Sequence, residues 1–139
     1  MSMPPPPPGL TRVAAVALAF AGLCGTGGVL LGAYAAHGGP DEMKEALSFA
    51  SLHALVHGLA LAAAALVHDR VLASRFSRWM LRVALLCFAL GVIMFSGDIY
   101  LRVFAIYLGT APHGGTAFLL GWLCLTLGGT MEIFRRRGP

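Results

Sequence analysis

Long apolar stretches separated by short polar segments dominate this chain. The stretches apolar enough to span a membrane cover residues 10–36, 46–67, 79–101 and 116–134. Each is close to the roughly 20 residues that a helix needs to cross the hydrocarbon core of a bilayer. The pattern therefore predicts an all-α integral membrane protein that forms a four-helix bundle.

Glycine, proline and polar residues mark the predicted helix ends. Segment 37–40 (HGGP) ends the first helix, and the acids at 41, 42 and 45 suit the first turn of the second, whose first turns lie in the interface. Residues 68–70 end the second helix, segment 71–78 is predicted to be a loop, and segment 112–115 (PHGG) a turn. Segment 103–110 is too short to cross, so it either extends the third helix or lies along the interface.

The chain begins with a segment of different character. Residues 1–9 include five consecutive prolines, which predict an extended, solvated tail before a single domain over residues 10–137. A signal peptide is the rival interpretation of residues 10–36, but its apolar core would end after roughly 7–15 residues. Here the apolar run continues to Tyr34, which favours a retained helix.

Composition and charge support the membrane assignment and predict its orientation. Hydrophobic residues make up 58% of the chain and charged residues 12%, against about 25% charged in soluble proteins. Eight of the ten lysines and arginines fall on one side of the predicted spans, and only Lys44 and Arg102 on the other. The positive-inside rule then places both termini in the cytoplasm. The basic residues form no patch mixed with aromatic ones, so no nucleic-acid partner is expected.

Small residues recur on the first two spans at spacings that suit helix packing. Gly28 and Gly32 form a GxxxG pair, and the second span carries a small residue at every fourth position. These positions serve either a partner-binding seam or packing within the bundle, and internal packing is favoured. The second span's stripe consists of Ala46, Ala50, Ala54, Gly58 and Ala62.

Two histidines share one face of the second span. His53 and His57 are four residues apart, which is metal-ligand spacing, and His57 falls near the bilayer midplane. An imidazole there must find a hydrogen-bond partner. Packing against a facing helix is favoured over a role as a proton carrier or a ligand for haem, copper or zinc. No cofactor is assigned, and the three cysteines lack metal or disulfide spacing.

A second group of polar residues falls toward the outer side. Asp98 follows Ser96 near the outer end of the third span, and Arg102, four residues later, is the expected ion-pair partner. His37 and His113 lie in the two outer turns. Six residues form a candidate polar pocket or ligand site of mixed nitrogen and oxygen groups, with His53 and His57 beneath the others. They are His37, His53, His57, Ser96, Asp98 and His113.

Four separated motifs resemble a known family. They are LGAYAAHG at 31–38, HGLAL at 57–61, FSGDIY at 95–100 and PHGGTAFLLGW at 112–122. The chain resembles the domain-of-unknown-function 423 family of small membrane proteins, relatives of transmembrane protein 256. The resemblance implies four transmembrane helices in a bacterial cytoplasmic membrane, or in the mitochondrial inner membrane of a eukaryote. It brings no established activity, and His37 and His57 match the histidines of the family motifs.

Three hypotheses follow for function. The first is a non-enzymatic accessory, assembly or structural component that binds a membrane-protein partner or a second copy of itself. The second is an oligomeric transporter or channel for protons, metal ions or a small solute that uses His57 and Asp98. The third is a haem- or metal-dependent redox subunit, which ranks last because no complete catalytic motif is present.

The predicted orientation is testable with a protease. Trypsin added to the external face of intact spheroplasts should leave the arginine-rich tail at 135–137 uncut, and trypsin added to inverted vesicles should cleave it. Cleavage from the external face would overturn the orientation while leaving the number of helices unchanged.

Overall fold

The computed structural model describes residues 9–70 and 74–135, and these residues form four long α-helices. Two short 3₁₀ helices, η1 (Asp41–Met43) and η2 (Arg102–Phe104), precede the second α-helix and follow the third. All four α-helices are long and apolar enough to cross a membrane, which confirms the predicted all-α four-helix membrane fold. The helices are α1 (Arg12–His37), α2 (Lys44–Arg70), α3 (Arg75–Leu101) and α4 (Ala111–Arg135).

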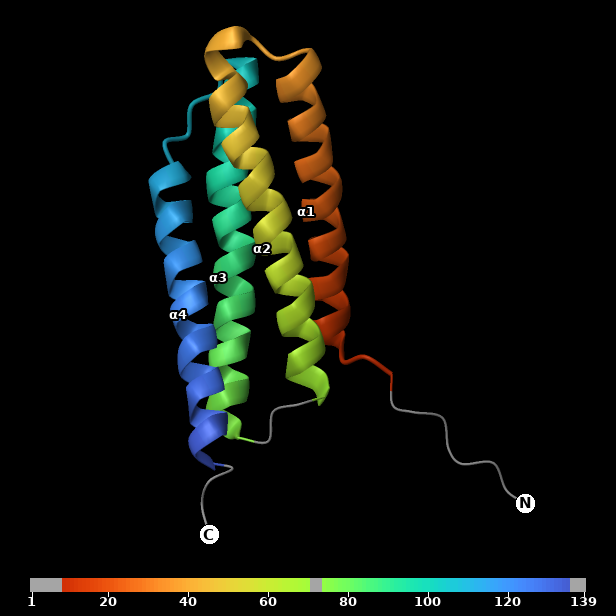
Figure 1. Cartoon of the computed structure of the whole chain (residues 1–139), viewed down its shortest axis with the longest axis vertical. Helices are drawn as coiled ribbons and strands as arrows, with labels where there is room; N and C mark the ends of the chain where they lie inside the picture. Colours follow the sequence, from red (N-terminus) through yellow and green to blue (C-terminus); the bar gives the residue numbers. More distant parts are fainter. Residues whose placement is uncertain (1–8, 71–73, 136–139) are drawn as a thin grey trace, which may run out of the picture.

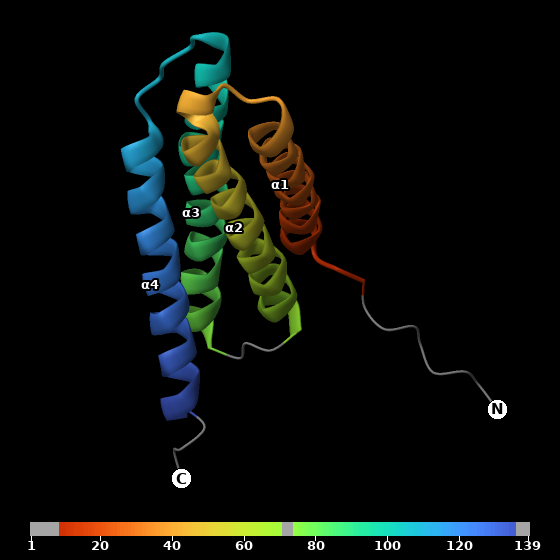
Figure 2. The ribbon, with the colours of Figure 1, turned by 45° about the horizontal axis from the view of Figure 1, so that its top comes forward.

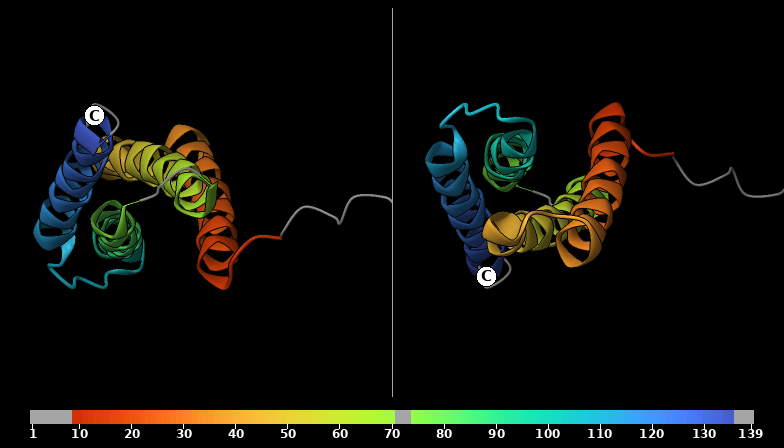
Figure 3. Two further views of the ribbon diagram at one scale, coloured as in Figure 1. Left: turned by 90° about the horizontal axis from the view of Figure 1, so that it is seen from below. Right: turned by 90° about the horizontal axis from the view of Figure 1, so that it is seen from above.

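The helices run alternately up and down, so α1 begins and α4 ends at the same end of the molecule (Figure 1). Each helix packs mainly on the next one in the chain, and α1 and α4 form the two flanks (Figures 1 and 2). In the end-on views α3 lies between the flanks (Figure 3). The most apolar stretches of α1 and α4 are only 22% and 17% buried, against 44% for α2 and for α3. The flanking helices therefore present most of their surface outward.

The seam between α1 and α2 is built from small residues. A Cβ added at Gly28 would lie 2.7 Å from Leu55 Cγ, and one added at Gly58 would lie 2.8 Å from Cys24 Cβ. Gly32 faces Ser51 in the same way. Steps of three and four alternate on α1, which is the heptad spacing of left-handed helix packing. Its buried positions are Ala14, Ala17, Ala21, Cys24, Gly28, Leu31 and Ala35.

The predicted stripe at every fourth residue of α2 follows this seam only over its middle. Ala50 and Ala54 are buried, but Ala46 and Ala62 at the two ends are only half-buried. A constant step of four overshoots the 3.6-residue turn, so such a stripe drifts around the helix. Leu47 and Leu61 take the buried positions at the two ends instead.

The seam between α3 and α4 corrects the prediction of a turn at 112–115, because these residues belong to the first turns of α4. Proline is tolerated in a first turn, where its missing amide would have no partner in the helix. A Cβ on Gly114 would lie 2.5 Å from the Phe95 backbone nitrogen, and one on Gly121 would lie 2.6 Å from the Phe88 ring. These glycines allow close helix approach; they do not break the helix.

The loop predicted at 71–78 is also too long. Helix α3 begins at Arg75, because the Ser74 side chain caps it by accepting a hydrogen bond from Ser77 N at 3.1 Å. Segment 103–110 extends α3 by η2 and then leaves the helix, with positive φ at Ala105 and Gly109. Residues 1–8 of the predicted tail at 1–9, residues 71–73 of the predicted loop and residues 136–139 lie outside the described residues.

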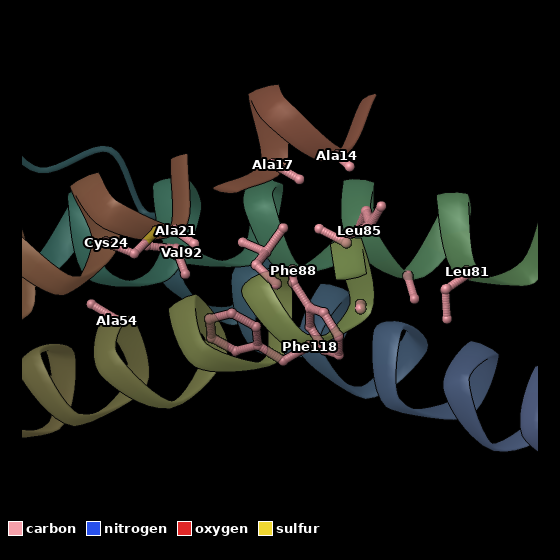
Figure 4. Close-up of a cluster of buried hydrophobic side chains, with 14 residues drawn as sticks. Ala14, Ala17, Ala21, Cys24, Ala54, Leu81, Leu85, Phe88, Val92 and Phe118 are labelled. Carbon is pink, nitrogen blue, oxygen red and sulfur yellow. The ribbon is translucent and has the colours of Figure 1, made fainter. Parts of the chain in front are cut away.

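The core lies where α1, α2, α3 and α4 meet (Figure 4). Helix α1 contributes Ala14, Ala17 and other small side chains, whereas Phe88 of α3 and Phe118 of α4 supply the large rings. Phe88 is fully buried. Small side chains on one side and rings on the other let the helices interdigitate at the density of a protein interior.

Substitution of one glycine in the α3–α4 seam should destabilise the bundle. Gly114→Ala places a methyl group against the backbone of α3, and overpacking of this kind costs about 1–3 kcal/mol. The matched control is Gly115→Ala, where a Cβ meets nothing within 4 Å. Unfolding in mixed micelles, followed by circular dichroism, measures both. Equal free energies of unfolding for the two variants would contradict the close approach.

Candidate functional site

His57 is the central residue of α2 and faces α3 and α4. It is only 6% exposed, and its ring stacks on Phe118 with a centroid distance of 3.5 Å and an interplanar angle of 11°. Phe88 and Trp122 complete the ring cluster at 5.6 and 6.1 Å. The imidazole therefore fills the space between α2 and α4.

Both nitrogens of His57 take part in hydrogen bonds. Nε2 lies 3.3 Å from Trp122 Nε1, and Nδ1 lies 2.9 Å from the His53 carbonyl oxygen. An indole nitrogen can only donate, so Nε2 must accept and Nδ1 must carry the proton. This arrangement satisfies a neutral imidazole completely and leaves it no lone pair for a metal or haem iron.

His53 lies one turn away and is half-buried. Its Nδ1 donates to the Phe49 carbonyl oxygen at 2.8 Å, and its ring lies 4.6 Å from Phe95 and 5.7 Å from His57. The two imidazoles stack with an interplanar angle of 17°, and each Nδ1 bonds to its own helix. Together these residues form an aromatic stack; they do not converge on one point as metal ligands would.

Asp98 is 0% exposed and connects α3 to the loop that leads into α4. Its Oδ1 accepts a hydrogen bond from Leu108 N at 3.1 Å, and its Oδ2 accepts one from Ala111 N at 3.0 Å. The ion pair expected from the four-residue spacing is present, with Arg102 Nη2 at 3.1 Å from Oδ2. A carboxylate is also stabilised by the positive end of the helix dipole, which lies at the start of α4. Asp98 therefore clamps the 105–110 loop and orients α4.

Serine hydroxyls join each neighbouring pair of helices. Ser51 Oγ donates to Gly28 O at 2.7 Å, which connects α2 to α1. Ser96 Oγ donates to Ala50 O at 2.8 Å, and Ser77 Oγ donates to Gly128 O at 3.0 Å. Ser96, which the sequence assigned to a polar pocket, thus bonds to the backbone of α2.

The candidate polar set does not gather into one site. His37 is exposed at the end of α1, and His113 is exposed in the first turn of α4. Asp98 and His57 are occupied by the separate contacts given above. Within residues 9–70 and 74–135, no group of three or more histidine, cysteine and acidic side chains is placed to hold a metal ion.

A large groove lies between α1 and α3. Its volume is about 860 Å³, and its walls are almost entirely apolar. Its lining includes Phe20 and Leu30 of α1, Ile93 of α3 and Ala54 of α2. Tyr34 and Tyr100 supply hydroxyl groups toward one end.

The sequence indicated neither this groove nor the partner of His57. Trp122 lies four residues after Phe118 on the same face of α4, and this spacing of two aromatic residues was the available signal. Ser51 is visible in the sequence only as a polar residue next to Ala50 in an apolar span, and Ser77 falls in the segment predicted to be a loop, so no signal pointed to its bond with α4. The groove depends on the tilt of α1 against α3, which no local pattern encodes.

Four apolar helices joined by short connections, with their polar side chains bonded inside the bundle, define a small multi-pass membrane protein. The chain belongs to the DUF423 family, described as proteins of unknown function, whose match covers residues 31–115. The family inferred from the four motifs is thereby confirmed.

The chain is also similar to a UPF0382 membrane protein of Haemophilus influenzae (strain ATCC 51907 / DSM 11121 / KW20 / Rd). The two are 33% identical over 107 residues, which cover 72% of this chain and 82% of that relative. No solved structure matches the chain.

Removal of the Asp98 carboxylate should destabilise the end of the bundle where α3 ends and α4 begins. Asp98→Ala leaves two backbone amides and the Arg102 guanidinium without their acceptor, and breaking a buried pair costs about 3–5 kcal/mol. The control is Asp41→Ala, because Asp41 forms an exposed pair with Lys44 worth at most about 1 kcal/mol. Unfolding in mixed micelles measures both, and similar losses would contradict the clamp.

Proposed function

We propose that this protein is a non-enzymatic accessory component of the membrane, and that its α1–α3 groove receives a transmembrane helix of a partner protein. The observation that carries the proposal is the contrast between the two sides of the molecule. Between α2, α3 and α4 the space is filled by rings and internal hydrogen bonds, whereas between α1 and α3 an apolar groove of about 860 Å³ stays open.

Glycines in the groove walls favour a helix as the occupant. Gly27 of α1 and Gly97 of α3 line the groove, and a Cβ built on either meets nothing within 4 Å. Membrane helices associate where small residues let their backbones approach, since lipid tails already satisfy apolar side chains. An acyl chain gains little from bare backbone, but a second helix gains close packing.

The transport alternative finds less support in the polar residues. A carrier would use His57 and Asp98 as exchangeable sites, yet both nitrogens of His57 and both carboxylate oxygens of Asp98 are engaged in internal bonds. In proteoliposomes, proton or metal-ion flux that His57→Gln abolishes would favour transport over the accessory role.

The same proposal includes a place in the cell. The bundle end where α1 begins and α4 ends carries Arg75, Arg78 and Arg135, and the opposite end carries Lys44 and Arg102. The similarity to a membrane protein of Haemophilus influenzae supports a bacterial membrane, which we take to be the cytoplasmic one. The positive-inside rule supports placing this arginine-rich end in the cytoplasm.

Filling the groove should release the partner. Gly27→Phe adds a ring at a groove position where a Cβ meets nothing within 4 Å, and should lower partner affinity about tenfold or more, the equivalent of overpacking by ~1–3 kcal/mol. The matched control is Gly22→Phe on the same helix, which has equal room and does not line the groove. Native purification in mild detergent, with quantitative mass spectrometry of bound chains, measures both.

Three outcomes would contradict the proposal. The wild-type protein purifying as a lone monomer would remove the partner, and an assembly of this chain alone would replace it with a homo-oligomer. Equal partner recovery with Gly27→Phe and Gly22→Phe would place the interface elsewhere.

A further inference from the structure

A second concave site lies at the arginine-rich end of the bundle, away from the groove. It has a volume of about 430 Å³ and lies where α1 begins, α2 ends and α3 begins. Three elements thus contribute to one pocket. Its lining residues are Thr11, His68, Arg75, Arg78, Trp79 and Arg82.

The pocket concentrates positive charge. Arg75, Arg78 and Arg82 are spaced three and four residues apart, so they share one face of α3. None of the described lining residues is acidic, and the ion pairs recorded over residues 9–70 and 74–135 involve other arginines and lysines. The first turn of α3 itself holds no acid, and the Glu132 carboxylate of α4, which accepts a hydrogen bond from Ser74 N at 3.0 Å, is not among the lining residues. Three guanidinium groups around one concave site favour an anionic ligand there.

One arginine is already oriented within this pocket. Arg82 Nε donates a hydrogen bond to His68 Nε2 at 3.0 Å, which joins α3 to α2. This bond uses one nitrogen of the guanidinium and leaves the two terminal nitrogens to donate elsewhere. Guanidinium groups bind phosphate oxygens through paired N–H donors, which makes arginine well suited to a phosphodiester.

The depth of the pocket identifies the source of the anion. The three arginines extend over about 10 Å along α3, from its first residue into the apolar span. Headgroups occupy roughly the outer 5–7 Å on each side of the hydrocarbon core, so the pocket overlaps the headgroup layer. Trp79 is 60% exposed at this level, as is typical of the aromatic belts that mark membrane interfaces.

We propose that this pocket binds the phosphate of an anionic phospholipid. Arg75 and Arg78 donate to the phosphodiester oxygens, Arg82 does so from the deeper side, and Trp79 packs against the glycerol and upper acyl chain. Basic pockets between transmembrane helices recognise anionic headgroups through this chemistry. The proposal is independent of the occupant of the groove.

Thermal unfolding of the full chain in mild detergent tests the site. Added phosphatidylglycerol should raise the Tm by about 3 °C or more, because a ligand that binds only the folded state stabilises it. Phosphatidylcholine with the same acyl chains and inorganic phosphate should each leave the Tm unchanged. Arg78→Gln should weaken phosphatidylglycerol binding about tenfold or more, through loss of charge-assisted hydrogen bonds. The matched control is Arg135→Gln, which removes an equal charge from the same end of the bundle outside the pocket.

Several results would overturn the proposal. An equal shift with phosphatidylcholine would show nonspecific lipid binding, and an equal shift with inorganic phosphate would show a soluble-anion site. Equal affinities for Arg78→Gln and Arg135→Gln would place the lipid elsewhere. If Arg78→Gln fails to fold, Arg78→Lys keeps the charge but loses the paired donors, and wild-type affinity in that variant would equally contradict the assignment.

Discussion

Close approach of helix backbones is the constraint on which this bundle depends. Apolar helices gain little by leaving lipid for one another, so their association needs tight packing and interhelical hydrogen bonds. Here Gly58 meets Cys24, and Gly114 meets the backbone of Phe95. At such distances a serine hydroxyl of one helix reaches a carbonyl oxygen of the next, as Ser51 reaches Gly28 at 2.7 Å. A separation greater by about 1 Å would exceed hydrogen-bond length, so the polar bonds depend on the glycine contacts.

The hydrocarbon environment also constrains the titratable residues inside the bundle. Hydrocarbon offers no water to an imidazole or a carboxylate, so each must find its partners within the protein. His57 finds a carbonyl oxygen and the Trp122 indole, and Asp98 finds two amides and a guanidinium. The His57–Trp122 bond connects α2 to α4, which are distant in sequence, and the Asp98 bonds hold the loop between α3 and α4 in one arrangement. The polar residues thereby stabilise one arrangement of the helices, which suits a protein that holds another component in place.

The sequence predicted what depends on local pattern and missed what depends on tertiary contact. Hydropathy alone located four spans, and the four-residue spacing located the Asp98–Arg102 pair. The sequence could not show that Asp98 also accepts a hydrogen bond from Leu108 N, because the path of the intervening loop determines that contact. The sequence places Gly114 in a turn. A glycine that ends a helix and a glycine that lets another helix approach cannot be distinguished in a sequence until the neighbouring helix is known. The sequence groups the candidate polar residues by their expected depth in the membrane. Which of these side chains meet depends instead on the direction that each one faces.

Residues of α2 and α3 line both proposed binding features, together with α1 in the groove and its N-cap Thr11 in the pocket, and this placement connects them. The groove involves α3 from Val92 onward, and the basic pocket involves it up to Arg82, so about 15 Å of helix separates them. A phospholipid held by the pocket would extend its acyl chains from the interface toward the bilayer midplane, along the α1–α3 side and toward the groove. A partner helix in the groove would then contact both this protein and that lipid. The α1–α3 side therefore combines charge at one end with bare backbone toward the other, and the lipid would help to define the surface that the partner meets.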